Sequence, residues 1–469
     1  MLSMKRRGAA RLAAVVVASG LVAAGAIATA GTAAADETTP THGGATATLG
    51  GLKTFDQAVV HNDGGDQRVG AGLFEMAVDN GGTLQTYCID IHNPTQQQAK
   101  YQEVPWSASS LHNNGDAGKI RWILQNSYPQ VNDLAALASK AGAGNLTEKT
   151  AAAGTQVAIW RFSDHAKVDA VDPAAEKLAD YLEKSAQNVG EPKASLTLDP
   201  PAVSGKSGGK LGPVTVHTNA DSVTIAPGAG AAAGVKVVGK DGKAVTSAAD
   251  GTQLFFDVPK GAADGSTSLT AQAATKVPVG RAFTGIGVHA KSQTQILAGS
   301  SESTVSAAAT ASWKKQGAIP AITAEKNCAK GGVDVTATNK GDEAFRFQLS
   351  GKDFEIAPGK SQTVTVPVAE DQPYNITIKG EGGFKKSFSG VLDCKTAGSG
   401  GGKPSTQPSP ASVGGSTGGS AGGDKGGDLA ETGSSNATPM IAGIAVVLVV
   451  VGGASVFFLR KKKTGTPAQ

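Results

Sequence analysis

Cysteine chemistry is the first possibility that this sequence raises, because one of its three cysteines has no obvious partner. Cys328 and Cys394 stand at the start and the end of one strand-rich stretch, where a disulfide would join the first strand to the last. Cys88 lies in a different part of the chain and is left over. From the residues alone, Cys88 is a buried inert thiol, half of an intermolecular disulfide, or a reactive nucleophile.

Gln156 is the second candidate, because it falls on the apolar face of an expected helix. Asn145 and Glu148 predict a capping-box start, and the helix then continues over residues 149–162. The positions three and four residues away from Gln156 are small or apolar: Ala152, Ala153, Ile159 and Trp160. A buried glutamine amide without partners costs about 1–3 kcal/mol. Either it bonds to a neighbouring backbone group, or its carbonyl carbon is bonded to sulfur.

A β-hairpin is expected to position Cys88. Residues 74–78 and 83–91 have the pattern of two strands, and the D-N-G-G sequence at 79–82 supplies a turn between them. Cys88 would lie on the second strand and point to the side opposite its two neighbours. The strand and the helix together would have to bring Cys88 and Gln156 into contact.

Three segments resemble the thioester domain of Gram-positive surface adhesins. They are Y-C-I-D-I-H-N-P at 87–94, I-L-Q-N-S-Y-P at 123–129 and T-Q-V-A-I-W at 155–160, the last matching a T-Q-x-A signature. The resemblance implies that Cys88 and Gln156 close a Cys–Gln thioester. It also implies a single acyl transfer to a partner's amine, in which the protein is consumed and no turnover enzyme is involved.

A T-Q pair alone is not specific. It also occurs at 252–253, 294–295 and 406–407, without a following A-I-W. The supporting candidates near the expected bond are Tyr87, Asp90, Thr155 and Trp160. The two aromatic side chains could exclude water or could be ordinary core. Asp90, His92 or His165 could act as a general base toward the amine, or could be structural polar residues.

The N-terminus has the pattern of a secretory signal peptide. Basic residues precede an apolar run at 12–30, and small residues follow before Asp36 opens a polar stretch. We expect residues 1–35 to be removed, with cleavage after Ala35 or, alternatively, after Ala30. The alternative function for this segment is a transmembrane anchor.

The C-terminus resembles a sortase sorting signal at residues 429–463. The motif L-A-E-T-G is formed by Leu429, Ala430, Glu431, Thr432 and Gly433. Residues 440–459 are uncharged and long enough for a transmembrane helix, and a basic tail follows. The resemblance, to the LAxTG variant of LPxTG signals, implies cleavage after Thr432 and its transfer to peptidoglycan. The alternative is a permanent membrane anchor.

The predicted fold class is multidomain and mainly β. Residues 45–190 combine strands and helices in an α+β thioester domain. Regularly spaced short strands predict immunoglobulin-like β-sandwiches at 195–312 and 318–395, the second containing the disulfide. Residues 396–428 are rich in Gly, Ser and Pro and are expected to be a disordered linker that spans the cell wall.

Charge and motifs exclude several function classes. The precursor has a net charge of +4, but four positive charges precede Asp36 and four follow Thr432, so the mature chain is near −4. Nucleic-acid binding is therefore not expected. No metal-ligand spacing, cofactor motif or nucleophile elbow is apparent, so we expect no cofactor, no metal, no small-molecule substrate and no turnover enzyme such as a cysteine protease.

The expected location is the cell wall, with the bulk of the chain outside the cell. The expected partners are sortase, peptidoglycan and an amine-bearing (lysine) surface or host protein. The alternative function is a wall-anchored spacer or coat protein in which Cys88 is inert. No Lys–Asn pair is singled out by its spacing for an isopeptide cross-link in the sandwiches.

Overall fold

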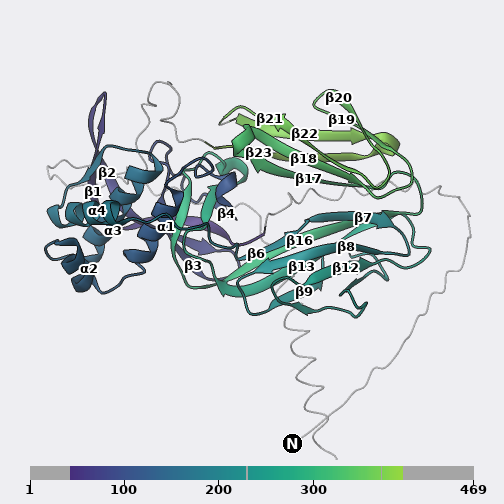
Figure 1. The fold of residues 1–469 in the computed structure, drawn as a ribbon, viewed down its shortest axis with the longest axis horizontal. Helices are drawn as coiled ribbons and strands as arrows, with labels where there is room; N and C mark the ends of the chain where they lie inside the picture. The colour runs from purple at the N-terminus through teal and green to yellow at the C-terminus, as the bar shows by residue number, and fades with distance from the viewer. Residues whose placement is uncertain (1–42, 229–230, 371, 395–469) are drawn as a thin grey trace, which may run out of the picture. The chain divides into compact units, whose positions relative to one another are not determined.

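The computed structural model describes residues 43–228, 231–370 and 372–394. β-strands dominate this part of the chain, and the helices gather around β1 and β2 (Figure 1). The signal peptide, the linker at 396–428 and the sorting signal at 429–463 lie outside the described residues. Among the described residues, no helix is long and apolar enough to cross a membrane.

The first sheet closes on itself. Its strands run in the order β2-β3-β15-β14-β4-β1-β5, and β1 also pairs with β2, so six strands form a barrel with β5 at the side. The bounds are β1 (Thr46–Asn62), β2 (Gly65–Val78), β3 (Thr83–Cys88), β4 (Lys100–Val104), β5 (Val168–Ala170), β14 (Ala282–Gly285) and β15 (Gln295–Ser300). Two register shifts near Gly51 bend β1. The bend lets one end pair with β4 and the other with β5.

β14 and β15 differ from the sequence-based expectation, which placed residues 195–312 in one sandwich. β14 pairs with β4, and β15 pairs with β3, so both strands belong to the first sheet. The physical reason is that the alternation of apolar residues marks a strand but does not say which sheet it joins. The barrel is therefore built from two stretches of the chain, one before and one after residues 196–276.

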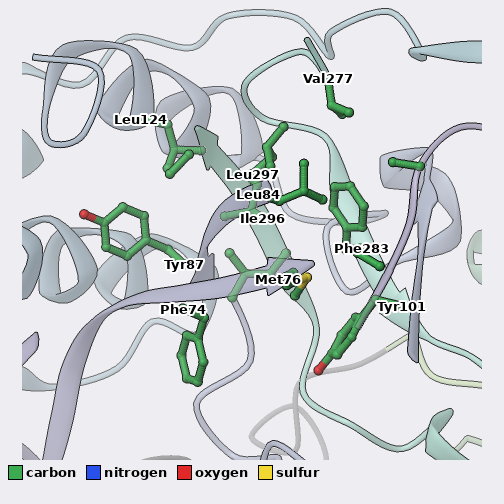
Figure 2. Close-up of a cluster of buried hydrophobic side chains, with 14 of the residues drawn as sticks. Phe74, Met76, Leu84, Tyr87, Tyr101, Leu124, Val277, Phe283, Ile296 and Leu297 are labelled. Carbon is green, nitrogen blue, oxygen red and sulfur yellow. The ribbon is translucent and has the colours of Figure 1, made fainter. Parts of the chain in front are cut away.

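Large apolar side chains fill the barrel (Figure 2). They converge from different strands of the ring and include Met76, Leu84, Tyr101, Phe283 and Leu297. Each of these is almost completely buried. The barrel is thus a packed core whose side chains hold β14 and β15 against the N-terminal strands.

The described residues contain four α-helices, namely α1 (Ala117–Asn126), α2 (Leu134–Ala141), α3 (Glu148–Ser163) and α4 (Pro173–Ser185). A short 3-10 helix, η1, covers Trp106–Ala108. α3 packs against β1, β2 and α4 and is buried along most of its length. This position explains why α3 is buried nearly all round rather than along one stripe.

The start of α3 corrects one detail of the sequence analysis. The N-cap is Thr147 and not Asn145, because the Thr147 side chain accepts a hydrogen bond from the backbone of Thr150. The Thr150 hydroxyl accepts in return from Thr147 N at 2.9 Å. A threonine in the third helical position replaces the acidic residue of the usual pattern, which is why the sequence pointed two residues too early.

The second group of strands forms two sheets, β10-β12-β8-β6 and β11-β9-β13-β16-β7. The bounds are β6 (Leu196–Asp199), β7 (Ala202–Lys206), β8 (Lys210–Thr218), β9 (Val223–Pro227), β10 (Lys236–Val238), β11 (Ser247–Ala248), β12 (Gln253–Asp257), β13 (Gly265–Lys276) and β16 (Glu302–Lys314). Between β13 and β16 the chain makes β14, η2 (Gly287–His289) and β15. Asp241 and Gly242 form a turn, in which Gly242 has a φ of 83°.

The last group forms a smaller β-sandwich from the sheets β17-β18-β21 and β20-β19-β22-β23. The bounds are β17 (Pro320–Asn327), η3 (Cys328–Lys330), β18 (Gly332–Asn339), β19 (Phe345–Leu349), β20 (Lys352–Ile356), β21 (Ser361–Pro367), β22 (Gln372–Gly380), η4 (Glu381–Gly383) and β23 (Lys385–Leu392). The predicted disulfide between Cys328 and Cys394 is confirmed. It links the end of the first strand to the end of the last.

Candidate functional site

β3 and α3 bring Cys88 and Gln156 into direct contact. Cys88 is the last residue of β3, and Gln156 lies in the middle of α3. The Cys88 N–H donates to Gln156 Oε1 at 2.9 Å, and Gln156 Nε2 donates to the Cys88 carbonyl at 2.8 Å. Both residues are completely buried. The backbone partner that a buried Gln156 requires is therefore the backbone of the free cysteine itself.

Two contacts fix the rotation of α3 and so aim Gln156 at β3. The Thr155 hydroxyl donates to Ala151 O at 2.7 Å and lies 2.6 Å from the hydroxyl of Ser127. Gly154 faces α4 so closely that a Cβ there would lie 2.4 Å from the carbonyl oxygen of Ala175. The threonine of the T-Q pair, Thr155, thus has a structural role. Gly154, the residue before it, allows α3 and α4 to approach each other closely.

Two N–H groups point at the sulfur of Cys88. Trp160 Nε1 and the backbone N of Asp90 each donate to Cys88 Sγ at 3.3 Å. Burial raises the pKa of the Cys88 thiol well above its usual value, and the carboxylate of Asp164 raises it further, while the Trp160 bond opposes the shift. The two donors are placed where negative charge on sulfur would need them. Trp160 is almost completely buried, so it also belongs to the core, which was one of the two roles considered for this side chain.

Asp164 is a neighbour of the site that the sequence analysis missed. It caps the C-terminus of α3, where its Oδ1 accepts from Ile91 N at 3.0 Å and its Oδ2 accepts from the Ser163 hydroxyl at 2.6 Å. Burial raises the pKa of Asp164 to about 6. The only signal in the sequence is an acidic residue at a helix C-terminus, where the helix dipole disfavours it.

The remaining candidates divide into buried and exposed residues. Tyr87 is completely buried, and its hydroxyl donates to Tyr128 O at 2.8 Å. Asp90 is also buried, and its Oδ2 accepts from Asn93 Nδ2 at 2.6 Å. His92 and His165 are both exposed, in contrast to the buried Cys88 and Gln156. Tyr87 and Asp90 therefore both make structural hydrogen bonds close to Cys88.

β15 supplies the strand beside Cys88, which the sequence analysis did not expect. Gln295 is the register partner of Cys88 and is completely buried. It belongs to one of the T-Q pairs that appeared uninformative. A signal that could have drawn attention to this segment is its run of polar residues at 292–295 directly before an apolar stretch. In the part of the chain that the structure describes, no group of His, Cys, Asp or Glu could hold a metal ion.

Comparison with protein families identifies two regions. Residues 85–188 match the family described as "Thioester domain", and this region contains both Cys88 and Gln156. Residues 320–391 match the family described as "Bacterial phospholipase C, C-terminal domain". The chain therefore carries a thioester-domain region, which occupies less than half of its length. No curated protein matches the chain.

Several solved structures are similar to this chain at low identity. The Bacillus anthracis TIE protein is 14% identical with a TM-score of 0.26, covering 75% of this chain and 81% of that chain. The thioester domain of the Enterococcus faecium TIE86 protein is 16% identical with a TM-score of 0.26, covering 58% and 97%. The E. coli chaperone DraB is 15% identical with a TM-score of 0.15, covering 42% and 98%.

Proposed function

We propose that this chain is a bacterial surface protein that closes a thioester between Cys88 and Gln156 and uses it to attach covalently to an amine-bearing partner. The observation that carries the proposal is the pair of hydrogen bonds between the Gln156 amide and the Cys88 backbone, at 2.9 and 2.8 Å. The match of residues 85–188 to the thioester-domain family supports it.

Thioester formation needs a thiol and an amide held together. Cys88 Sγ attacks the Cδ carbon of Gln156, a C–S bond forms, the C–N bond breaks, and the nitrogen leaves as ammonia with the thiol proton. Amides are poor acyl donors, so most of the acceleration has to come from fixed geometry. The N–H groups of Trp160 and Asp90 favour negative charge on the attacking sulfur.

The thioester then stores an acyl group for one transfer. A partner amine, which we take to be a lysine side chain, attacks the same carbon. A C–N bond forms, the C–S bond breaks, and Cys88 regains its proton as a free thiol. The product is an amide between Gln156 and the partner, so the protein is consumed and is not a turnover enzyme. Complete burial of both residues keeps bulk water from hydrolysing the bond.

We further propose that the chain is anchored to the cell wall. The L-A-E-T-G motif ending at Gly433 would be cut by sortase, and Thr432 would be joined to peptidoglycan. The two β-sandwiches, which we take to be immunoglobulin-like, and the linker at 396–428 would then hold the barrel away from the wall. The partner would be a surface or host protein that presents an accessible lysine.

The second candidate function is a wall-anchored spacer or coat protein with an inert thiol. One observation favours it: burial raises the pKa of the Cys88 thiol, which lowers the fraction of reactive thiolate. The two functions differ in one covalent bond and can be separated by mass.

The test is the intact mass of the chain from Asp36 to Cys394, purified without amines, beside the Cys88→Ala and Gln156→Ala variants. A fragment ending near residue 195 is unsuitable because it lacks β14 and β15. We expect only the unsubstituted chain to be lighter by one ammonia and to gain one methylamine on treatment. A mass equal to that of the plain sequence, together with a Cys88 that reacts with a thiol reagent after unfolding, would contradict thioester formation and support the spacer function.

A further inference from the structure

The hairpin of β14 and β15 completes the surroundings of Cys88. Gln295 is in register with Cys88. Ile89, the residue that follows Cys88, donates its N–H to Thr294 O at 3.1 Å. These residues lie outside the region 85–188 that matches the thioester-domain family. Part of the environment of Cys88 is therefore supplied by a segment from much later in the chain.

The side chain of Gln293 holds the turn that follows Cys88. Its Nε2 donates to Asp90 O at 2.7 Å and to Asn93 O at 2.9 Å. Gln293 is completely buried. Both amide hydrogens are thus used on backbone carbonyls of one short turn, which limits how that turn can rotate.

Gln293 is in turn held by other buried groups. Its Oε1 accepts from Gln295 Nε2 at 3.1 Å, and Gln295 Oε1 accepts from the Thr86 hydroxyl at 3.0 Å. The Tyr101 hydroxyl donates to the Gln293 carbonyl at 2.8 Å, and Tyr101 lies in the packed barrel of Figure 2. Buried hydrogen bonds that reinforce one another in this way specify a single arrangement, because breaking any of them is costly.

The turn held by Gln293 carries one of the two donors to the sulfur. Asp90 N donates to Cys88 Sγ at 3.3 Å, while Asp90 O accepts from Gln293. We propose that Gln293 is a positioning residue for the Cys88–Gln156 chemistry, acting by fixing Asp90 so that its N–H faces the sulfur. This inference rests on the proposed function. It assigns β15 a role in the reaction beyond closing the barrel.

A matched pair of substitutions separates this role from simple stability. Gln102 is a second buried glutamine of the same barrel, and its Nε2 donates to Gly43 O at 2.7 Å and Ala45 O at 3.3 Å. Gln293→Met and Gln102→Met each keep the side-chain length and remove two bonds to backbone carbonyls. Only the first touches the turn that follows Cys88.

The experiment measures rates in the full chain, isolated in unfolded form so that Gln156 still carries its amide, and then refolded from denaturant without amines. Intact mass gives the rate of ammonia loss and the rate of methylamine addition, and a thermal melt gives the loss of stability. We expect similar melting shifts for the two variants. We expect Gln293→Met to slow ammonia loss at least about tenfold, and Gln102→Met to stay within about twofold of the unsubstituted chain.

Equal rates in Gln293→Met and the unsubstituted chain would overturn the proposal, as would equal slowing by both methionine variants. If Gln293→Met does not fold, Gln293→Asn is measured instead, since it keeps an amide on a shorter side chain. A folded Gln293→Asn that reacts at the unsubstituted rate also overturns it. The unsubstituted chain is the separate check on the proposed function, because that function fails if this chain never loses ammonia.

Discussion

At the residue scale, the sulfur of Cys88 is surrounded by groups with opposite effects. Burial disfavours the thiolate, and the nearby carboxylate of Asp164 disfavours it further. The N–H groups of Trp160 and Asp90, both at 3.3 Å, favour negative charge there. Sulfur carries negative charge as the thiolate that attacks the amide, and it gains negative charge again as the leaving group when the thioester breaks. These two donors should therefore influence both steps of the proposed reaction.

Trp160→Phe removes one of these donors while keeping an aromatic side chain in the core. Hydrogen bonds to charged groups are worth about 1.5–3 kcal/mol, so we expect ammonia loss and methylamine addition to slow by roughly 10- to 100-fold. Intact mass against time measures both rates. Trp106→Phe is the control, since Trp106 Nε1 donates to Gly280 O at 2.8 Å away from the cysteine. Unchanged rates in Trp160→Phe would show that this N–H is structural only.

Asp164 should make stability depend on pH. Its pKa is about 6 in the folded protein and about 4 in an unfolded chain, so the folded protein binds more protons between these values. The contribution of Asp164 to the free energy of unfolding therefore falls as pH rises from about 4 to 6, by at most about 3 kcal/mol. Asp164→Asn should remove that fall, measured by denaturant unfolding at pH 4.5 and 7. Parallel pH profiles for both proteins would contradict the assignment, and Asp241→Asn, at an exposed turn, is the control.

At the element scale, α3 is the part that carries Gln156 to β3. It is buried between α4 and the strands β1 and β2, and Thr147 and Thr150 cap its start. Its distance from α4 is set by Gly154, where a Cβ would lie 2.4 Å from Ala175 O. A shift of the helix would move the Gln156 amide away from Cys88.

Gly154→Ala should therefore destabilise the protein although alanine favours helices. The new methyl group meets backbone that cannot move aside, and overpacking of this kind costs about 1–3 kcal/mol. Denaturant unfolding measures the loss. Gly144→Ala is the matched control, because nothing lies within 4 Å of a Cβ at Gly144. A loss in Gly154→Ala no larger than in this control would mean that α3 adjusts without strain.

At the scale of the whole molecule, the chain leaves the barrel after β5 and returns to it with β14 and β15 before β16. The barrel, and with it the surroundings of Cys88, therefore depends on contacts between residues far apart in sequence. The last sandwich is different, since its strands β17 to β23 are consecutive and pair among themselves. The disulfide between Cys328 and Cys394 closes this consecutive stretch.

Removing the disulfide should weaken the last sandwich and leave the Cys88 chemistry unchanged. Replacing both Cys328 and Cys394 by serine opens a loop of 66 residues in sequence separation. The unfolded chain then gains entropy, and we expect a loss of about 4 kcal/mol. A thermal melt measures the loss, and intact mass measures the rate of ammonia loss. A change in that rate as large as in Trp160→Phe would contradict this separation.

The sequence by itself determined the local features of this protein. Alternation and turn residues placed the hairpin that carries Cys88, and apolar spacing placed Gln156 on a buried helix face. The positions of Cys328 and Cys394 predicted their disulfide. These features depend on neighbours in sequence, so a local pattern is enough to find them. The capping box of α3 was placed two residues early because a threonine serves where a glutamate is usual.

Only the tertiary structure decided which distant segments meet. A strand pattern at 295–300 is the same whether the strand joins a sandwich or a barrel, so β15 was expected in the wrong sheet. The contacts of Gln293 and Asp164 with the turn after Cys88 depend on that pairing and on where α3 ends. Sequence periodicity reports the environment of a residue. It does not report the identity of its neighbours, and chemistry depends on the neighbours.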